Sequence, residues 1–106
     1  MGVILETLPT HSEFLTNSGS IFEVLVSDGS IREFYLQDVS DPKTSQYTVS
    51  FSLLFRAPAD IAPEQGTYRM KHPELGIIEL FLVPTKRDAD GIYFESIFNN
   101  LAAKAA

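Results

Sequence analysis

Cysteine is absent from the 106 residues of this chain, and its absence excludes several kinds of chemistry at once. No disulfide can form, no thiol can act as a nucleophile, and no cysteine-ligated structural zinc site can assemble. A chain without cysteine also suits a reducing compartment, so we expect a cytoplasmic location.

Positive charge is scarce as well. Eight Lys and Arg stand against fourteen Asp and Glu, which gives a formal net charge of −6, and the basic residues are scattered along the chain. Because binding to phosphates needs a local positive field, this distribution argues against a nucleic-acid partner.

Long apolar runs are missing too. The N-terminal segment has an apolar run of only Val3 to Leu5, without the basic residues that precede the apolar part of a secretory signal. No window approaches the roughly 18 apolar residues of a membrane-spanning helix. We therefore expect neither export through a signal peptide nor a membrane as partner.

What the chain has in quantity is apolar and aromatic side chains. Hydrophobic residues make up 44% of the chain and aromatic residues 11%, including eight Phe, which is sufficient to build the core of one domain of this length. We expect residues 1–100 to form a single β domain and residues 101–106 an alanine-rich tail.

One short helix is predicted near the N-terminus. Thr10 and Glu13 have the spacing of a capping box, in which the hydroxyl and the carboxylate each accept a hydrogen bond from the other residue's backbone amide. Phe14 and Leu15 would face the core, and residues 17–19 would end the helix.

After this helix the apolar residues alternate with polar ones, which predicts β-strands. An Asp28-Gly29 turn should join the first two strands into a hairpin. Residues 40–45 form a predicted loop, residues 57–65 form the longest connection and the best place for a functional surface, and residues 85–91 form a turn. The six predicted strands are residues 21–27, 30–38, 47–56, 68–71, 77–83 and 92–98.

Six short strands joined mostly by turns predict an all-β fold, an antiparallel meander of about six strands closed into a small barrel. Closure removes exposed strand edges, which favours the barrel, but a two-sheet sandwich is the alternative. The aromatic residues expected to fill the interior are Phe22, Phe34, Phe51, Phe81 and Phe94.

Residues that could carry chemistry are few. His11 and His72 lack the spacing of metal ligands, and His72 fits a solvated turn. The Asp88 to Gly91 run resembles half a calcium loop but is more typical of a hairpin turn. Ser50 and Ser52 have no histidine nearby in sequence. We expect no catalytic residue, no cofactor and no metal.

Arg56 ends an apolar run on the strand predicted to be central. Its side chain would either extend to water or pair with a strand carboxylate, Glu79 or Glu95. The structural interpretation is favoured, with Arg56 closing one end of the barrel through such a pair.

Three blocks of the chain, "FSLLFRAP", "EQGTYRMKHPELGIIELFLVP" and "IYFESIFN", resemble a family of small bacterial domains of unknown function. Members have FSLLFRGP, QGTYRLEHPELG and FLVP blocks in this order, and a looser similarity covers Leu5 to Phe14. Ala57 stands where the family has glycine. The resemblance implies a compact domain with no assigned reaction, and it associates the family with phage-tail-like assemblies.

Three functions are compatible with these observations. The first is a non-enzymatic structural or protein-interaction module whose partner is a second copy or a component of a tail-like assembly. The second is a barrel that binds a small molecule, a ligand class that the sequence does not exclude. The third and least favoured is a hydrolase. A small-molecule site would be lined by Tyr35, Tyr47, Tyr68 and Tyr93.

Overall fold

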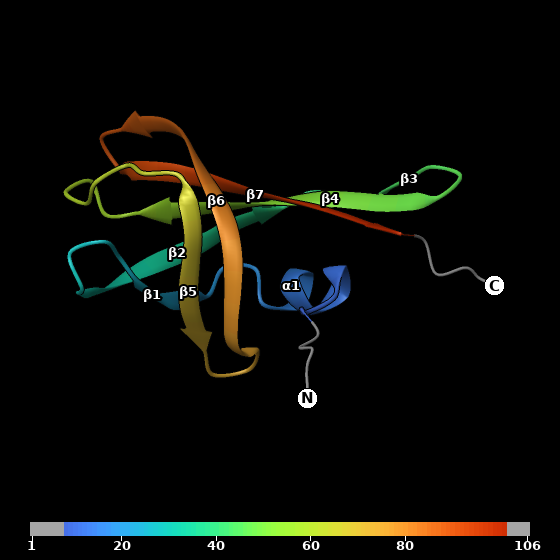
Figure 1. Ribbon diagram of the computed structural model, residues 1–106, viewed down its shortest axis with the longest axis horizontal. Helices are drawn as coiled ribbons and strands as arrows, with labels where there is room; N and C mark the ends of the chain where they lie inside the picture. Colours follow the sequence, from blue (N-terminus) through green and yellow to red (C-terminus); the bar gives the residue numbers. More distant parts are fainter. Residues whose placement is uncertain (1–7, 102–106) are drawn as a thin grey trace.

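The computed structural model of the protein describes residues 8–101, which form one short helix and seven strands joined in a single antiparallel sheet (Figure 1). Six of the strands close into a barrel in the order β2-β1-β5-β6-β7-β4, because β2 also pairs with β4. The seventh, β3, pairs with β4 outside this circle. The elements are α1 (His11–Thr16), β1 (Ile21–Leu25), β2 (Ile31–Val39), β3 (Lys43–Thr44), β4 (Thr48–Ala57), β5 (Gly66–His72), β6 (Gly76–Asp88) and β7 (Gly91–Leu101).

The predicted all-β barrel is confirmed, and the β2–β4 pairing decides it over the sandwich. The predicted meander is wrong, because β4 pairs with β7 and β5 pairs with β1 instead of β4 with β5. Most strand boundaries differ from the prediction by one or two residues, and three differences go further. Lys43 and Thr44 form β3 inside the predicted loop 40–45. β6 continues to Asp88, so the predicted turn 85–91 shrinks to Ala89 and Asp90. β7 extends to Leu101, past the predicted end at residue 98 and one residue into the predicted tail, whose residues 102–106 lie outside the described part of the chain.

The helix begins as its sequence predicts. The Thr10 Oγ1 accepts a hydrogen bond from the Glu13 amide at 3.2 Å, and Glu13 Oε1 accepts one from the Thr10 amide at 2.9 Å. These two bonds satisfy donors that a helix N-terminus otherwise leaves free. Phe14 is fully buried as predicted, whereas Leu15 faces away from the core and is exposed.

The predicted hairpin of β1 and β2 is confirmed, with its turn one residue earlier than expected. The Gly29 amide bonds to the Val26 carbonyl at 2.9 Å, and the Val26 amide bonds to the Ser30 carbonyl at 3.0 Å. Gly29 has φ of +88°, a conformation that is strained for other residues. The loop therefore has three residues with the glycine last, a common hairpin type.

The barrel interior is filled by alternate residues of its strands. Phe22, Phe34, Phe55 and Phe94 have no exposed surface. The prediction for Phe81 is wrong, because this side chain points outward and is 53% exposed. Residues 80–83 are all apolar, so the sequence pattern does not distinguish the inward positions, Leu80 and Leu82, from the outward ones.

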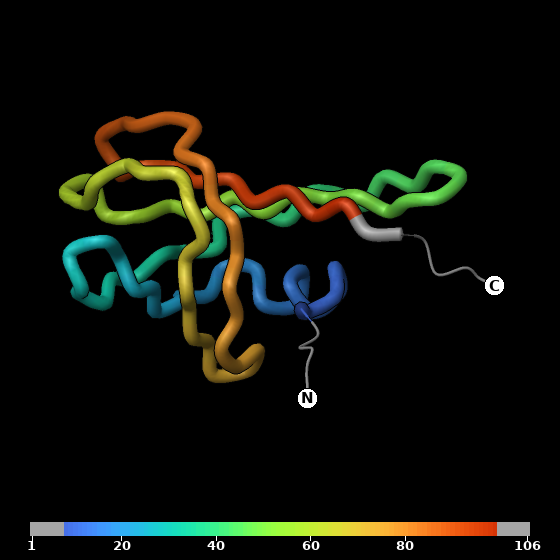
Figure 2. Tube along the Cα trace, in the orientation of Figure 1, coloured from blue at the N-terminus to red at the C-terminus, as the bar shows by residue number. Residues whose placement is uncertain are grey.

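Long strands change partners along their length. β6 pairs with β5 through Leu82 and with β7 from Val83 onwards. A register shift between Pro84 and Lys86 follows directly after this change of partner. Proline has no backbone donor, so a bulge is a position that accommodates it. This bend lets β6 form a corner of the barrel, and in Figure 2 the β5–β6 pair crosses the long β4–β7 pair steeply.

The start of β4 and the end of β7 project beyond the barrel as an extension, with the short β3 on the other side of β4 (Figure 1). We call this extension the β4–β7 ribbon; it consists of residues 48–53 and 96–101. Its inner face carries Phe51 and Phe98, whose rings stack at 4.7 Å. Phe14 of α1 packs on Phe98, with the two ring centroids 5.4 Å apart, so the short helix covers the apolar face of the ribbon. No helix among residues 8–101 is long and apolar enough to cross a membrane.

Candidate interaction surface

A groove follows β5 where β1 diverges from it. The register pairs β1 with β5 only at Glu23–Lys71 and Val24–Met70. Before that point, residues 66–69 of β5 pair with β6 on one side and have no strand partner on the other within the described part of the chain. Two adjoining depressions of about 330 and 260 Å³ share Leu25 and Arg69. The smaller follows this edge, and the larger lies beside it, over the paired residues of β1 and β5. We call them together the β5 groove.

The larger depression is apolar. Leu25 lies directly opposite Ile31, and Ile77 lies opposite Lys71. These three apolar side chains are 43%, 59% and 59% exposed, and the almost fully buried Met70 also lines the depression. Exposed apolar residues scattered singly are ordinary, whereas a group around one depression is typical of an interaction site.

Charges of both signs border the apolar part of the groove. Glu23 and Lys71 are cross-strand neighbours, and Arg69 pairs with Glu79 at 3.6 Å. Both partners of the Arg69–Glu79 pair are more than half exposed, so the pair contributes little to stability. These side chains are free to reorient toward a partner.

The connection 57–65, the best place in the sequence for a functional surface, mostly folds onto the end of the barrel. Ile61 is buried, and Asp60 accepts a hydrogen bond from Arg32 at 2.6 Å, which lowers the pKa of the Asp60 carboxyl. The buried Tyr68 hydroxyl donates to the Glu64 carbonyl, and burial raises the pKa of Tyr68. Only Glu64 and Gln65 of this connection line the groove.

His72 is buried, so its prediction as a solvated turn residue is wrong. Its Nδ1 accepts hydrogen bonds from the amides of Glu74 at 2.9 Å and Leu75 at 3.3 Å. Its ring packs against the Phe22 ring, with the two centroids 4.5 Å apart. Burial lowers the pKa of His72, so the neutral ring organises the β5–β6 turn.

The same ring forms a serine–histidine contact that resembles a catalytic pair but has the opposite proton arrangement. Because both amides donate to Nδ1, the proton lies on Nε2, which donates to Ser20 Oγ at 2.8 Å. The Ser20 hydroxyl in turn donates to the Asn17 carbonyl at 2.6 Å. A general base must accept the serine proton, and this nitrogen is itself a donor.

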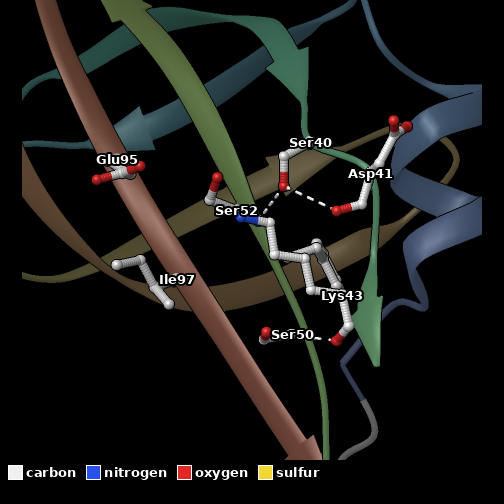
Figure 3. Close-up of a pocket in the computed structure, with 8 residues that line it drawn as sticks. Ser40, Asp41, Lys43, Ser50, Ser52, Glu95 and Ile97 are labelled. Atoms are coloured by element: carbon white, nitrogen blue, oxygen red, sulfur yellow. Dashed lines mark hydrogen bonds between the residues drawn. The ribbon is translucent and has the colours of Figure 1, made fainter. Parts of the chain in front are cut away.

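Ser50 and Ser52 lie on the outer face of the β4–β7 ribbon beside Ser40, Lys43 and Ile97 (Figure 3). The Ser40 hydroxyl accepts from the Ser52 amide at 2.8 Å, and the Ser50 hydroxyl donates to the Lys43 carbonyl at 3.5 Å. These bonds attach the β2–β3 connection and β3 to β4, so the hydroxyls of Ser40 and Ser50 support the ribbon.

Arg56 does not pair with Glu79 or Glu95 as predicted. It donates to Gln37 Oε1 at 3.1 Å, and its guanidinium lies 4.7 Å from the centre of the Tyr35 ring. Tyr93 is the cross-strand neighbour of Arg56, and Lys86 lies 4.7 Å from the Tyr93 ring. Cations and aromatic rings thus alternate across the outer faces of β2, β4, β7 and β6.

The four tyrosines proposed to line a ligand site do not gather. Tyr35 and Tyr93 lie in this outer row, Tyr68 faces the core, and Tyr47 is exposed before β4. The Asp88 to Gly91 run forms the predicted turn, with Asp88 Oδ1 accepting from the Asp90 amide at 2.8 Å. Among the described residues, no three potential ligands come close enough to hold a metal ion.

The fold and groove define a small antiparallel β-barrel with an open strand edge in its wall. Residues 9–98 match the family described as a domain of unknown function, DUF6916, and the chain belongs to this family. No curated protein and no solved structure matches the chain.

Sequence reasoning missed the β5 groove, although a signal for it is present. Leu25, Ile31 and Ile77 occupy positions of the alternating pattern that should face water. Apolar residues at outward positions of neighbouring strands indicate a covered or partner-binding face. The register needed to bring these three together could not be read from the sequence.

Proposed function

We propose that this protein is a non-enzymatic protein-interaction module that binds an extended segment of a partner protein along the β5 groove. The observation that carries this proposal is the open edge of residues 66–69 together with the adjoining depression, which the exposed side chains of Leu25, Ile31 and Ile77 line. A partner segment would add a strand to this edge through main-chain hydrogen bonds.

The chemistry of the groove describes the segment it would accept. An extended chain places alternate side chains on the same face, so apolar residues two apart would enter the depression lined by Leu25, Ile31 and Ile77. Acidic and basic residues in the segment would meet Lys71 and Glu23 at the border. The family resemblance suggests a component of a tail-like assembly as the source of the segment and a cytoplasmic setting.

The proton arrangement of the Ser20–His72 contact supports a function other than catalysis. The hydroxyls of Ser40 and Ser50 support backbone segments in the same structural way. The barrel interior is occupied by aromatic and aliphatic side chains, which favours the outer surface over the interior as the binding site.

A library of displayed linear peptides tests this proposal without knowledge of the natural partner. We expect the full chain to select peptides with apolar residues at alternate positions. We expect Ile77→Lys to weaken their binding roughly tenfold or more, because a charge would occupy the apolar depression. Ile97→Lys, an exposed position on β7 outside the groove, is the matched control and should bind normally.

Hydrogen exchange of the complex provides the second measurement. Addition of a strand should protect amides within residues 66–69, because they gain hydrogen-bond partners. Selected peptides that bind the Ile77→Lys variant as tightly as the unmodified protein, or that leave these amides unprotected, would refute the groove as the binding site.

A further inference from the structure

The β5 groove depends on the shortest strand pairing in the barrel wall. Within residues 8–101, β1 and β5 pair only at Glu23–Lys71 and Val24–Met70, whereas every other pairing that closes the barrel joins at least four positions. We call these two pairs the β1–β5 seam. The larger depression of the groove has Leu25 on the β1 side and Lys71 on the β5 side, so its shape depends on a closed seam.

A buried histidine adds a further link across this seam. His72 follows Lys71 on β5, and continuation of the register places it opposite Phe22, whose ring packs against the imidazole. His72 Nε2 lies 2.8 Å from the Oγ of Ser20, directly before β1. The Ser20 hydroxyl then donates to the carbonyl of Asn17, the C-cap of α1. One imidazole thus connects the end of β5, the start of β1 and the end of α1.

A second proton on this ring would have to bind at Nδ1, because Nε2 already carries the proton that it donates to Ser20. Nδ1 accepts hydrogen bonds from the amides of Glu74 and Leu75. A proton at Nδ1 would point one donor at two others, so both bonds would be lost. The charged ring would also face Phe22 in the interior, which is unfavourable. The closed seam therefore requires the neutral ring.

The charged groups on the neighbouring elements do not compensate for this cost. Burial lowers the pKa of His72, and the negative charge of Glu74 in the adjoining turn opposes this more weakly. On α1, Glu13 lines a depression with Glu74, but its carboxylate caps the helix. On β1 and β5, Glu23 and Lys71 are exposed neighbours of opposite charge. A protonated His72 is thus best accommodated when its ring reaches water.

We propose that His72 is an acid-sensitive switch whose protonation opens the β1–β5 seam and abolishes the β5 groove as a binding site. This inference rests on the proposed function, because it describes how that site is regulated. Near neutral pH an ordinary histidine is largely uncharged, so the seam is closed and the groove can accept a strand. The open seam binds the proton more tightly than the closed one, so falling pH shifts the balance toward the open form.

NMR titration of the full chain without any peptide tests the switch itself. Near neutral pH the imidazole nitrogens of His72 should show the neutral ring with its proton on Nε2. Between about pH 7.5 and 5, the amides of Glu74, Leu75 and the β1–β5 seam should shift together with the His72 ring. His72→Gln should remove this response. His11→Gln is the matched control and should keep it, because His11, the other histidine, packs on the ribbon instead.

Peptide binding tests the effect on the groove. For a selected peptide without histidine, the dissociation constant should rise severalfold between about pH 7.5 and 5, by no more than about tenfold per pH unit because one proton is taken up. His72→Gln should bind with nearly constant affinity over this range, and His11→Gln should behave like the unmodified protein.

Two results would overturn the switch. One is a set of seam amides that do not respond when His72 is protonated, and the other is a peptide affinity that stays constant with pH in the unmodified protein. Failure to select any peptide at neutral pH would instead refute the proposed function, and the NMR titration would still decide whether His72 opens the seam. This titration uses the unmodified protein, so the test stands even where His72→Gln does not fold.

Discussion

Phe94 and Phe98 lie on the same strand, four residues apart, but in two different environments. Around Phe94, β7 has neighbours on both sides and forms part of a closed barrel. Around Phe98, β7 has only β4 beside it among residues 8–101 and forms one edge of a ribbon. The barrel satisfies its strand edges internally, whereas the ribbon leaves one edge available to another chain.

The sources of packing differ in the same way. The ring of Phe94 packs against the rings of Phe34 and Tyr68, which belong to two other barrel strands. The ring centroids lie 5.5 and 5.6 Å from that of Phe94. Phe98 packs against Phe51 and against Phe14 of the six-residue helix α1. The body is therefore held by contacts among several strands, and the ribbon depends on one short helix.

The largest expected effect comes from Phe94→Ala. Removal of a fully buried ring should lower the free energy of unfolding by about 3–5 kcal/mol, since the barrel wall cannot collapse around the cavity. Urea unfolding followed by circular dichroism measures this loss. Phe81→Ala is the matched control. Phe81 is more than half exposed on β6, so its removal should lower the free energy of unfolding much less.

Phe98→Ala sharpens the comparison. Its main effect should be local, with faster hydrogen exchange in α1 and residues 96–101 and smaller changes in β5 and β6. Equal acceleration of exchange throughout the molecule would contradict the division into a closed body and a dependent ribbon.

The sequence predicts the barrel well because alternation and turn residues are local signals. The capping box at Thr10 and the Gly29 hairpin depend on residues within a few positions of each other. The errors arise where the pattern is ambiguous or the contact is distant. Phe81 lies in a run of four apolar residues, so the sequence does not show which of them point into the barrel.

The candidate surfaces could be predicted only in part for the same reason. The burial of His72 depends on Ser20, 52 residues away, and on Phe22. The partner of Arg56 is decided by the β2–β4 pairing that closes the barrel, which places Tyr35 opposite it. Neither pairing leaves a local trace in the sequence.

A smaller effect is expected from acid. The His72 pKa is lowered in the folded protein, while an unfolded histidine titrates near 6.5. The unfolded chain then binds more protons below about pH 6.5, so the free energy of unfolding falls as pH decreases, by at most about 1.4 kcal/mol per pH unit. Above that pH the contribution of His72 is fully present.

Urea unfolding at several pH values measures this dependence, and His72→Gln provides the comparison because glutamine does not titrate. The difference between the two proteins should depend on pH below about 6.5 and be constant above it. A constant difference across the whole range would contradict a neutral His72 in the folded state. Since His72 reaches Ser20 beside the end of α1, acid should loosen the junction of barrel and helix.

The smallest effect is expected from Arg56→Ala, on the outer wall of the closed barrel. Loss of the contact with the Tyr35 ring and of the bond to Gln37 should lower the free energy of unfolding by about 0.5–1 kcal/mol. Arg56→Lys should lose less of the free energy of unfolding than Arg56→Ala, because a lysine keeps the charge over the ring but lacks the planar guanidinium. An unchanged melting temperature in Arg56→Ala would mean that the alternating row of cations and rings adds nothing to wall stability. Closure of the barrel would then rest on its backbone pairing and interior alone.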